Sequence, residues 1–168
     1  MNIFFTADTH FNHKNIIKYS KRPFQTIEEM NEKLIENWNN KVKDNDEIYH
    51  LGDFGFKKID DSIEIVKKLN GKKYLIIGNH DRSLNKEFKS YFEFVKKFYV
   101  LNYQSNDIVL YHYFHSPWYK DNENSILLHG HSHGKMVHPI GLKTLDVGVD
   151  CNNYNPFSFD EICKILNK

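Results

Sequence analysis

The sequence has few cysteines and no long apolar run. The two cysteines, Cys151 and Cys163, have no spacing typical of a metal or redox motif, so we expect reduced, structural side chains. The apolar run at positions 2–5 is too short for a signal peptide or a membrane span, and no later stretch is long enough for a spanning helix. We therefore expect a cytoplasmic protein that does not contact a membrane.

The sequence also lacks an excess of charge of either sign. It contains 23 Lys and Arg side chains against 22 Asp and Glu, a formal net charge of +1. Strong binding to the phosphate backbone of a long nucleic acid needs a broad cationic surface. Such binding is not expected here, whereas a small or local anionic substrate is compatible with this composition.

The chain is long enough for one ordinary domain. Apolar residues make up 40% and aromatic residues 15% of the 168 positions, which is typical of a globular chain with its own core. Neither an internal repeat nor a low-complexity linker divides it. We therefore expect a single domain over residues 1–168.

Hydrophobic patterns alternate between strands and helices in the first half of the chain. Short apolar runs predict strands over 2–7, 47–51, 73–77, 125–128 and 143–149, and a strand pair over 95–103 and 108–113. Amphipathic spacing predicts helices over 26–40, over 61–69 and from 158 onward, two of them opened by capping boxes. This order indicates a mixed sheet system with helices outside.

Polar motifs stand where the predicted strands end. They are Asp8-Thr-His10, Gly52-Asp53, Gly78-Asn79-His80-Asp81, His112 and Gly130-His131-Ser-His133. The carboxyl ends of strands are where binding loops converge, and glycine lets the backbone leave a strand sharply. Each motif alone occurs often by chance or in a turn. Together, in this order, they predict one cluster of side chains able to bind metal.

The motif order D-x-H, G-D, G-N-H-D, H and G-H-x-H resembles the calcineurin-like metallophosphoesterase superfamily. Segments 49–54 and 15–24 further resemble its short phage and bacterial branch. The resemblance implies an α+β fold, a four-layer α/β/β/α sandwich in which helices flank two mixed β-sheets. It also implies two divalent metal ions as cofactors.

The resemblance assigns a role to each motif residue. Asp8, His10 and His133 would bind the first ion, and Asn79, His112 and His131 the second. Asp53 would bridge the two ions. His80 would lie beside the substrate without binding metal, and Asp81 would orient the His80 ring.

Elementary chemistry agrees with this assignment. One carboxylate can span two ions about 3.5–4 Å apart, and the ions lower the pKa of a bridging water and polarise phosphoryl oxygens. His80 would stabilise the developing charge or protonate the leaving oxygen. Aspartate, histidine and asparagine without thiolate suit Mn²⁺, which we favour, with Fe, Zn²⁺ and Ni²⁺ as alternatives.

Several polar residues have two interpretations in the sequence. His13, His50 and His129 either orient neighbouring ligands or simply pack. Arg22 either holds a substrate phosphate or is an exposed arginine before a helix. His115 and His138 are expected at the rim of the site or on the surface.

The function that follows is hydrolysis of a phosphoester by a metal-bridging hydroxide. A phosphodiester, such as a small nucleotide or a nucleic-acid end, is favoured by the resemblance alone. The alternatives are a phosphomonoesterase using the same site and a non-catalytic interaction scaffold with the same fold. A nucleic-acid-binding module without turnover conflicts with the neutral charge. The oligomeric state stays open.

Overall fold

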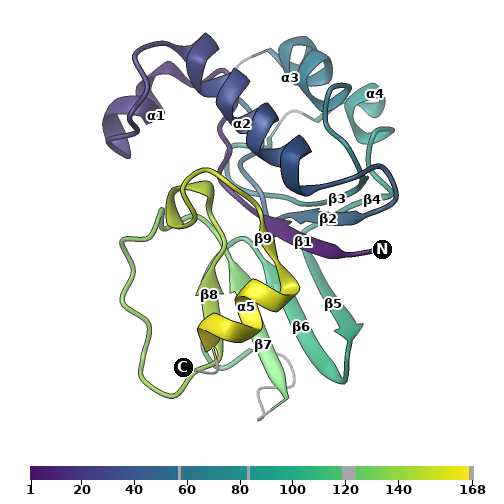
Figure 1. Ribbon diagram of the computed structural model, residues 1–168, viewed down its shortest axis with the longest axis vertical. Coiled ribbons are helices and arrows are strands. Elements are labelled where there is room, and N and C mark those ends of the chain that lie inside the picture. Colours follow the sequence, from purple (N-terminus) through teal and green to yellow (C-terminus); the bar gives the residue numbers. More distant parts are fainter. Residues whose placement is uncertain (57, 83, 119–123, 167–168) are drawn as a thin grey trace.

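Two β-sheets lie face to face in the computed structural model, which describes residues 1–56, 58–82, 84–118 and 124–166 (Figure 1). The first sheet has the order β4-β3-β2-β1-β9 and the second β5-β6-β7-β8. The strands of the first sheet are β1 (Ile3–Thr6), β2 (Glu47–His50), β3 (Lys72–Ile76), β4 (Phe94–Lys96) and β9 (Phe157–Ser158). Those of the second are β5 (Phe98–Tyr103), β6 (Asn106–Tyr111), β7 (Ser125–His129) and β8 (Thr144–Asp146).

Helices cover the first sheet on the side away from the second sheet (Figure 1). They are α1 (Lys14–Tyr19), α2 (Ile27–Lys41), α3 (Ile59–Val66) and α4 (Lys86–Lys89). The last helix, α5 (Phe159–Leu166), contacts β1, β8 and β9, and its buried side chains join the core between the sheets. A 3₁₀ turn, η1 (Val149–Cys151), follows β8.

Parallel pairing brings the carboxyl ends of the central strands to a common edge. In the first sheet β1 to β4 are parallel and only β9 is antiparallel. In the second sheet β6, β7 and β8 are parallel, and β5 is antiparallel to β6. The loops after β1, β2, β3, β6 and β7 therefore leave their sheets in a shared direction, as the strand-end motifs require.

Alternation along each strand separates two cores. Phe4, Ile48 and Leu75 point from the first sheet toward the helices, while their neighbours point toward the second sheet. In the second sheet Ile108, Leu110, Ile126 and Leu128 complete the core between the sheets, and Val109 and Leu127 meet Trp118 on the outer face. Each sheet is thus apolar on both faces.

Helix α2 anchors the outer layer. The Thr26 hydroxyl accepts the amide proton of Glu29 at 3.1 Å, which caps the helix start. Met30, Leu34 and Trp38 follow at helical spacing and are buried against the first sheet. At the other end of the chain Ser158 caps α5 through the amide of Glu161, so both predicted capping residues are observed.

The predicted fold class is confirmed, since two mixed sheets carry flanking helices. The predicted strand over 95–103 is in fact two strands in different sheets. β4 pairs with β3, and after Lys97 the chain enters the second sheet as β5, which pairs with β6. Apolar alternation continues through this crossing, so it does not indicate where a strand changes its partner.

The remaining differences concern short elements. Helix α3 begins at Ile59, earlier than the predicted start at 61, and the helices α1 and α4 and the strand β9 were not predicted. These three span six, four and two residues, too few for a periodic pattern. Among the described residues, no helix combines the length and the apolar character that crossing a bilayer requires.

Packing of α2 yields a stability prediction. Leu34 is 3% exposed within the helix-side core, so Leu34→Ala should lower the free energy of unfolding by about 2–5 kcal/mol. The neighbouring Lys33 is exposed, and Lys33→Ala should change stability by about 0.5 kcal/mol or less. Chemical denaturation of both variants measures the difference, and equal effects would contradict this account of the core.

Candidate metal centre

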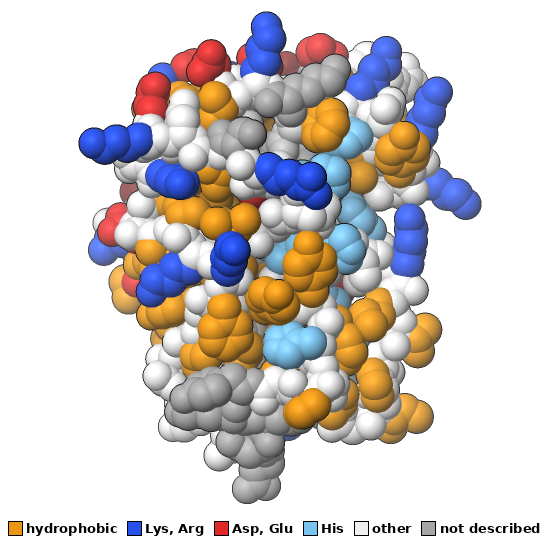
Figure 2. All heavy atoms as spheres, turned by 180° about the vertical axis from the view of Figure 1, so that it is seen from behind, with side chains coloured by type: hydrophobic (Ala, Val, Ile, Leu, Met, Phe, Trp, Pro, Cys, Tyr) orange, Lys and Arg blue, Asp and Glu red, His pale blue; other side chains and the backbone are white. Residues whose placement is uncertain are grey.

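The motif residues come together where the two sheets meet. Asp8 and His10 follow β1, Asp53 follows β2, and Asn79 follows β3. From the second sheet, His112 follows β6, and His131 and His133 follow β7. Figure 2 shows the outcome on the surface: histidine side chains gather in a band, bordered in its upper part by lysine or arginine side chains.

The backbone at this cluster is strained. Five of the seven expected ligands have left-handed backbone angles, with φ of 48° to 68°: Asp8, His10, Asp53, His131 and His133. This region costs non-glycine residues about 1–3 kcal/mol each and is concentrated at functional sites. The strain turns each side chain out of its strand direction and into the cluster.

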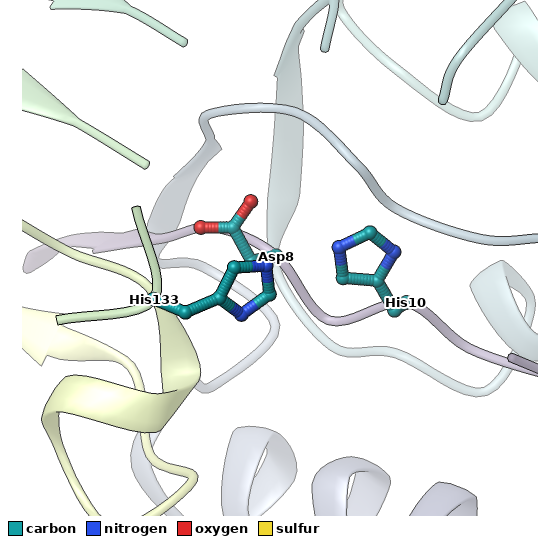
Figure 3. Close-up of side chains that lie close together, drawn as sticks. All are labelled: Asp8, His10 and His133. Carbon is teal, nitrogen blue, oxygen red and sulfur yellow. The ribbon is translucent and has the colours of Figure 1, made fainter. Parts of the chain in front are cut away.

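The first group of possible metal ligands is Asp8, His10 and His133, whose ligand atoms lie within 4.8 Å of one another (Figure 3). Asp8 is fully buried, and its Oδ2 accepts the amide proton of His131 at 2.8 Å. Its Oδ1 and both ring nitrogens of His10 are buried and have no hydrogen-bond partner among the residues that the structure describes. Buried polar atoms are normally paired, so these unpaired atoms fit the place of a cation ligand.

The second group is Asp53, His112 and His131, again with ligand atoms within 4.8 Å. His112 Nδ1 lies 2.7 Å from the carbonyl oxygen of Leu51, and a carbonyl only accepts, so this nitrogen carries the proton. The Nε2 lone pair therefore faces the centre of the group. It lies 3.1 Å from Asn79 Oδ1, which places the asparagine oxygen beside it.

Asp53 lies between the two groups. Its Oδ2 is 3.6 Å from His10 Nε2 in the first group and 3.5 Å from His112 Nε2 in the second. Its Oδ1 accepts the amide proton of His80 at 2.8 Å. A carboxylate in this position can serve both groups, which is the geometry that a bridging ligand needs.

Burial and charge set the protonation states at the centre. Burial raises the pKa of Asp8 to about 7 and lowers the pKa of His10 to about 2. Burial would also raise the pKa of Asp53, but the hydrogen bond and charge of His112 outweigh it and hold this pKa below its usual range. A nearby divalent cation favours ionised aspartate and neutral histidine, so the donor set suits metal.

Two glycines leave room for the buried carboxylates. A Cβ atom at Gly130 would lie 2.7 Å from Asp8 Oδ2, and one at Gly78 would collide with the Asp53 side chain. Both glycines precede residues of the cluster. Their role here is close approach, because any larger side chain would displace a candidate ligand.

The two residues expected to act beside the metals have different surroundings. His80 is exposed, and its ring centroid lies 5.2 Å from that of His10, so the ring stands beside the cluster and in reach of solvent. Asp81 is buried and accepts three backbone amide protons, from Gly78, Asp53 and Phe54, at 2.7–3.1 Å. Asp81 therefore joins the loops after β2 and β3, whereas we expected it to orient His80.

Arg22 fits neither of its two interpretations. It is 4% exposed, so it is not a surface arginine, and its guanidinium is fully engaged inside the protein. Its partners are the backbone oxygens of Asp8 and Thr9 and the carboxylate of Asp150. It supports the loop after β1 instead of facing a substrate.

Among the flanking histidines, His50 has the clearest supporting role. It is buried, its Nδ1 accepts the amide proton of Gly52, and its Nε2 lies 2.9 Å from the Thr9 hydroxyl. It thereby joins the loop after β1 to the loop after β2. His13 caps α1 through the amide of Ile16 and stacks on Phe56 at 3.9 Å.

The remaining histidines lie near the second sheet. His129 is buried and its Nε2 lies 2.7 Å from that of His138, which is half-buried and not a free surface residue. His115 lies against the Tyr111 ring at the edge of the site region.

Sequence reasoning missed two aspartates that shape the site. Asp150 accepts a hydrogen bond from His133 Nδ1 at 2.7 Å. Asp146 accepts from the Ser132 hydroxyl and from the backbone amides of Gly134 and Gly148 at 2.7–2.8 Å, and so forms the turn that carries His131 and His133. Asp150 directly follows the strand predicted over 143–149, and Asp146 lies within it, so neither carries a motif that marks it as part of the site.

Comparison with known proteins places this geometry in a family. A family model described as the calcineurin-like phosphoesterase superfamily domain matches residues 1–150. An uncharacterized protein of Methanocaldococcus jannaschii is 39% identical, with 99% of this chain and 92% of that protein covered. The Gene 66 protein of Mycobacterium phage L5 is 27% identical, with 99% and 94% covered. A crystal structure of an Aquifex aeolicus protein of unknown function aligns with a TM-score of 0.77 at 28% identity, covering 98% of both chains.

The position of Asp53 between the groups predicts how metal binding responds to mutation. Asp53→Ala should abolish the paired binding of two Mn²⁺ ions, because the second group loses a member and the first loses the carboxylate that faces its His10. His80→Ala should retain both ions, since its ring lies outside the two groups. Calorimetric titration with Mn²⁺ measures the stoichiometry, and an equal loss in the two variants would contradict the assignment.

Proposed function

Since the chain belongs to the calcineurin-like phosphoesterase superfamily, we propose that this metal-dependent phosphoesterase hydrolyses a phosphodiester at a two-ion centre. We place the first ion at Asp8, His10 and His133, the second at Asn79, His112 and His131, and Asp53 between them. The observation that carries this proposal is the Asp53 carboxylate, which faces one histidine of each group. The oxygen and imidazole ligands favour Mn²⁺.

Two bound divalent ions would supply an activated water and positive charge for the phosphoryl oxygens. The protein's part is to hold the ligands and to place His80 at the open side of the cluster. His80 is fixed through its backbone amide, which donates to Asp53 Oδ1, while its ring stays exposed. From there the ring can stabilise charge on the phosphate or donate a proton to the leaving oxygen.

Two hollows adjoin His80 and support a substrate with two ester substituents. We name the first the ligand hollow: it is lined by five of the seven expected metal ligands, all but Asp8 and His112, together with His13, Tyr19 and Lys135. We name the second the apolar hollow: it is lined mainly by Phe54, Phe56, Ile59, Leu84 and Phe88. His80 lines both. A phosphate bound at the metals could then direct its larger substituent into the ligand hollow, of about 230 Å³, and a small one toward the apolar hollow, of about 40 Å³, whereas a monoester requires only one such space.

Side chains at the mouth of the ligand hollow suit a nucleotide or a nucleic-acid end. The Tyr19 side chain is 65% exposed there, and the Lys135 ammonium donates to the Tyr19 carbonyl at 3.3 Å. An exposed aromatic ring can stack on a base, and a neighbouring cation can pair with a further phosphate. Cys151 and Cys163 are free thiols, which suits a reducing compartment, and we place the reaction in the cytoplasm.

The reaction is tested with Mn²⁺-loaded protein and a chromogenic phosphodiester beside the matching monoester. We expect turnover of both with preference for the diester. No turnover of either substrate with any divalent metal would contradict the proposal that the protein is an enzyme. Preference for the monoester would contradict the proposed preference for diesters.

His80→Ala should lower kcat for the diester by about 10²–10⁴-fold while both ions stay bound, because it removes the acid or charge-stabilising group only. His115→Ala is the matched control, since His115 contributes to neither hollow and should leave kcat unchanged. Steady-state kinetics on metal-loaded protein measures kcat for both variants. Equal kcat values would contradict the proposed role of His80 in the reaction.

Tyr19→Ala tests the nucleotide part of the proposal. It should raise KM for a dinucleotide by about tenfold, from a stacking contribution of about 1–3 kcal/mol per base, and leave KM for a small chromogenic diester unchanged. Ile165→Ala removes another exposed apolar side chain that lines neither hollow, and should alter neither KM. An unchanged KM for the dinucleotide in Tyr19→Ala would argue against stacking at this position.

A further inference from the structure

Asp150 and Arg22 form a buried ion pair directly behind the first group of ligands. The two side chains are joined by two hydrogen bonds, Nε to Oδ1 at 2.9 Å and Nη2 to Oδ2 at 2.8 Å. The side chains are 0% and 8% exposed, so the pair is shielded from solvent. A two-pronged contact of this kind fixes the carboxylate in one plane and in one direction.

Arg22 also holds the segment that carries Asp8 and His10. Its Nη2 donates to the carbonyl oxygen of Asp8 at 2.7 Å, and its Nη1 donates to that of Thr9 at 2.9 Å. These carbonyls belong to the loop with the left-handed residues Asp8 and His10. One guanidinium thereby joins this strained loop to Asp150, which follows β8.

Asp150, held in place by Arg22, in turn binds the ring of His133. Its Oδ2 accepts from His133 Nδ1 at 2.7 Å, so the proton of the neutral ring belongs on Nδ1 and the Nε2 lone pair is the one left for a metal. The Ser20 hydroxyl lies 3.2 Å from the same Nδ1, which further occupies that nitrogen. The His133 ring is thus directed by contacts outside the set of ligands.

We propose that Asp150, held by Arg22, is the positioning residue of the first metal ion: it fixes the ring and tautomer of His133 so that His133 binds through Nε2 opposite Asp8 and His10. The inference rests on the proposed two-ion centre and adds a residue that no motif contains. Carboxylates that accept from the second nitrogen of a metal-binding histidine orient the ring and increase its basicity.

Replacing Asp150 should weaken the binding of the first ion only. In the second group, His112 Nδ1 donates to the backbone oxygen of Leu51 and has no contact with Asp150 or Arg22. The protein therefore orients His133 through a side chain, Asp150, and His112 through a backbone oxygen, that of Leu51. A side-chain substitution can remove only the contact to His133.

The test is calorimetric titration of Asp150→Asn with Mn²⁺, compared with wild type and with Glu161→Gln. The control also removes one carboxylate charge from an ion pair, the Lys41–Glu161 pair that joins α2 to α5 away from the centre. We expect wild type and Glu161→Gln to bind two ions alike. Asp150→Asn should bind one ion normally and the other about 10–100-fold more weakly.

Each outcome decides one proposal or both. A folded Asp150→Asn variant with two unchanged affinities would overturn the positioning role alone, as would an equal weakening of both ions, which indicates a general structural effect. Wild-type protein that binds no divalent ion would overturn the proposed function and this inference together. Circular dichroism of the metal-free variants establishes whether each is folded.

A measurement on wild-type protein keeps the inference testable if Asp150→Asn does not fold. Zn²⁺ is diamagnetic, so long-range ¹H–¹⁵N spectra of the Zn²⁺-loaded protein report which nitrogen of each histidine carries a proton. His133 should retain its proton on Nδ1 and bind metal through Nε2. Metal on His133 Nδ1 would overturn the inference, because Asp150 could not then accept from that atom.

Discussion

The constraint on which this structure depends is the burial of polar atoms that the protein itself does not satisfy. Asp8 Oδ1 and both ring nitrogens of His10 lie inside the fold, at the edge where two apolar sheets meet, and no residue in the described part of the chain forms a hydrogen bond with them. Each such group costs about 1–3 kcal/mol. Net stabilities of domains are only about 5–15 kcal/mol, so this arrangement needs well-packed cores on both faces of the first sheet. It also means that a cation bound there would stabilise the native state.

Buried charged side chains support the loops in which the backbone is strained. The five left-handed residues aim their side chains inward. Arg22 holds the strained loop after β1, and aspartates that are not expected ligands hold those after β2 and β7. Asp81 joins the loops after β2 and β3, Asp146 forms the turn before His133, and Asp150 fixes His133 itself. These three residues thus support the loops that the ligands strain.

The strand-end motifs were predicted in full because their signal is local. A short apolar run followed by Gly-Asp or Gly-Asn-His-Asp indicates both the strand and the turn after it, and the structure brings all seven expected ligands together. The supporting contacts were not predictable in this way. Arg22 and Asp150 lie 128 positions apart, and a lone arginine or aspartate has no pattern that indicates a distant partner. Asp81 was expected to act on its neighbour in the chain, but its partners are the backbone amides of Gly78, Asp53 and Phe54.

The sequence by itself determined a mixed sheet system with helices outside and the residues available to bind metal, because apolar periodicity and short motifs record local conformation, and the two-sheet α+β arrangement followed from the resemblance of those motifs to a known family. Only the tertiary structure decided which nitrogen of His112 and of His133 faces the centre, which side chains support the ligand loops, and where the chain passes from the first sheet to the second. Those features depend on hydrogen bonds and strand pairing between segments far apart in the chain. Such contacts form only when the two sheets pack together, so the carboxylate first expected to orient His80 supports the Asp53 loop, and the arginine first considered for substrate supports Asp8.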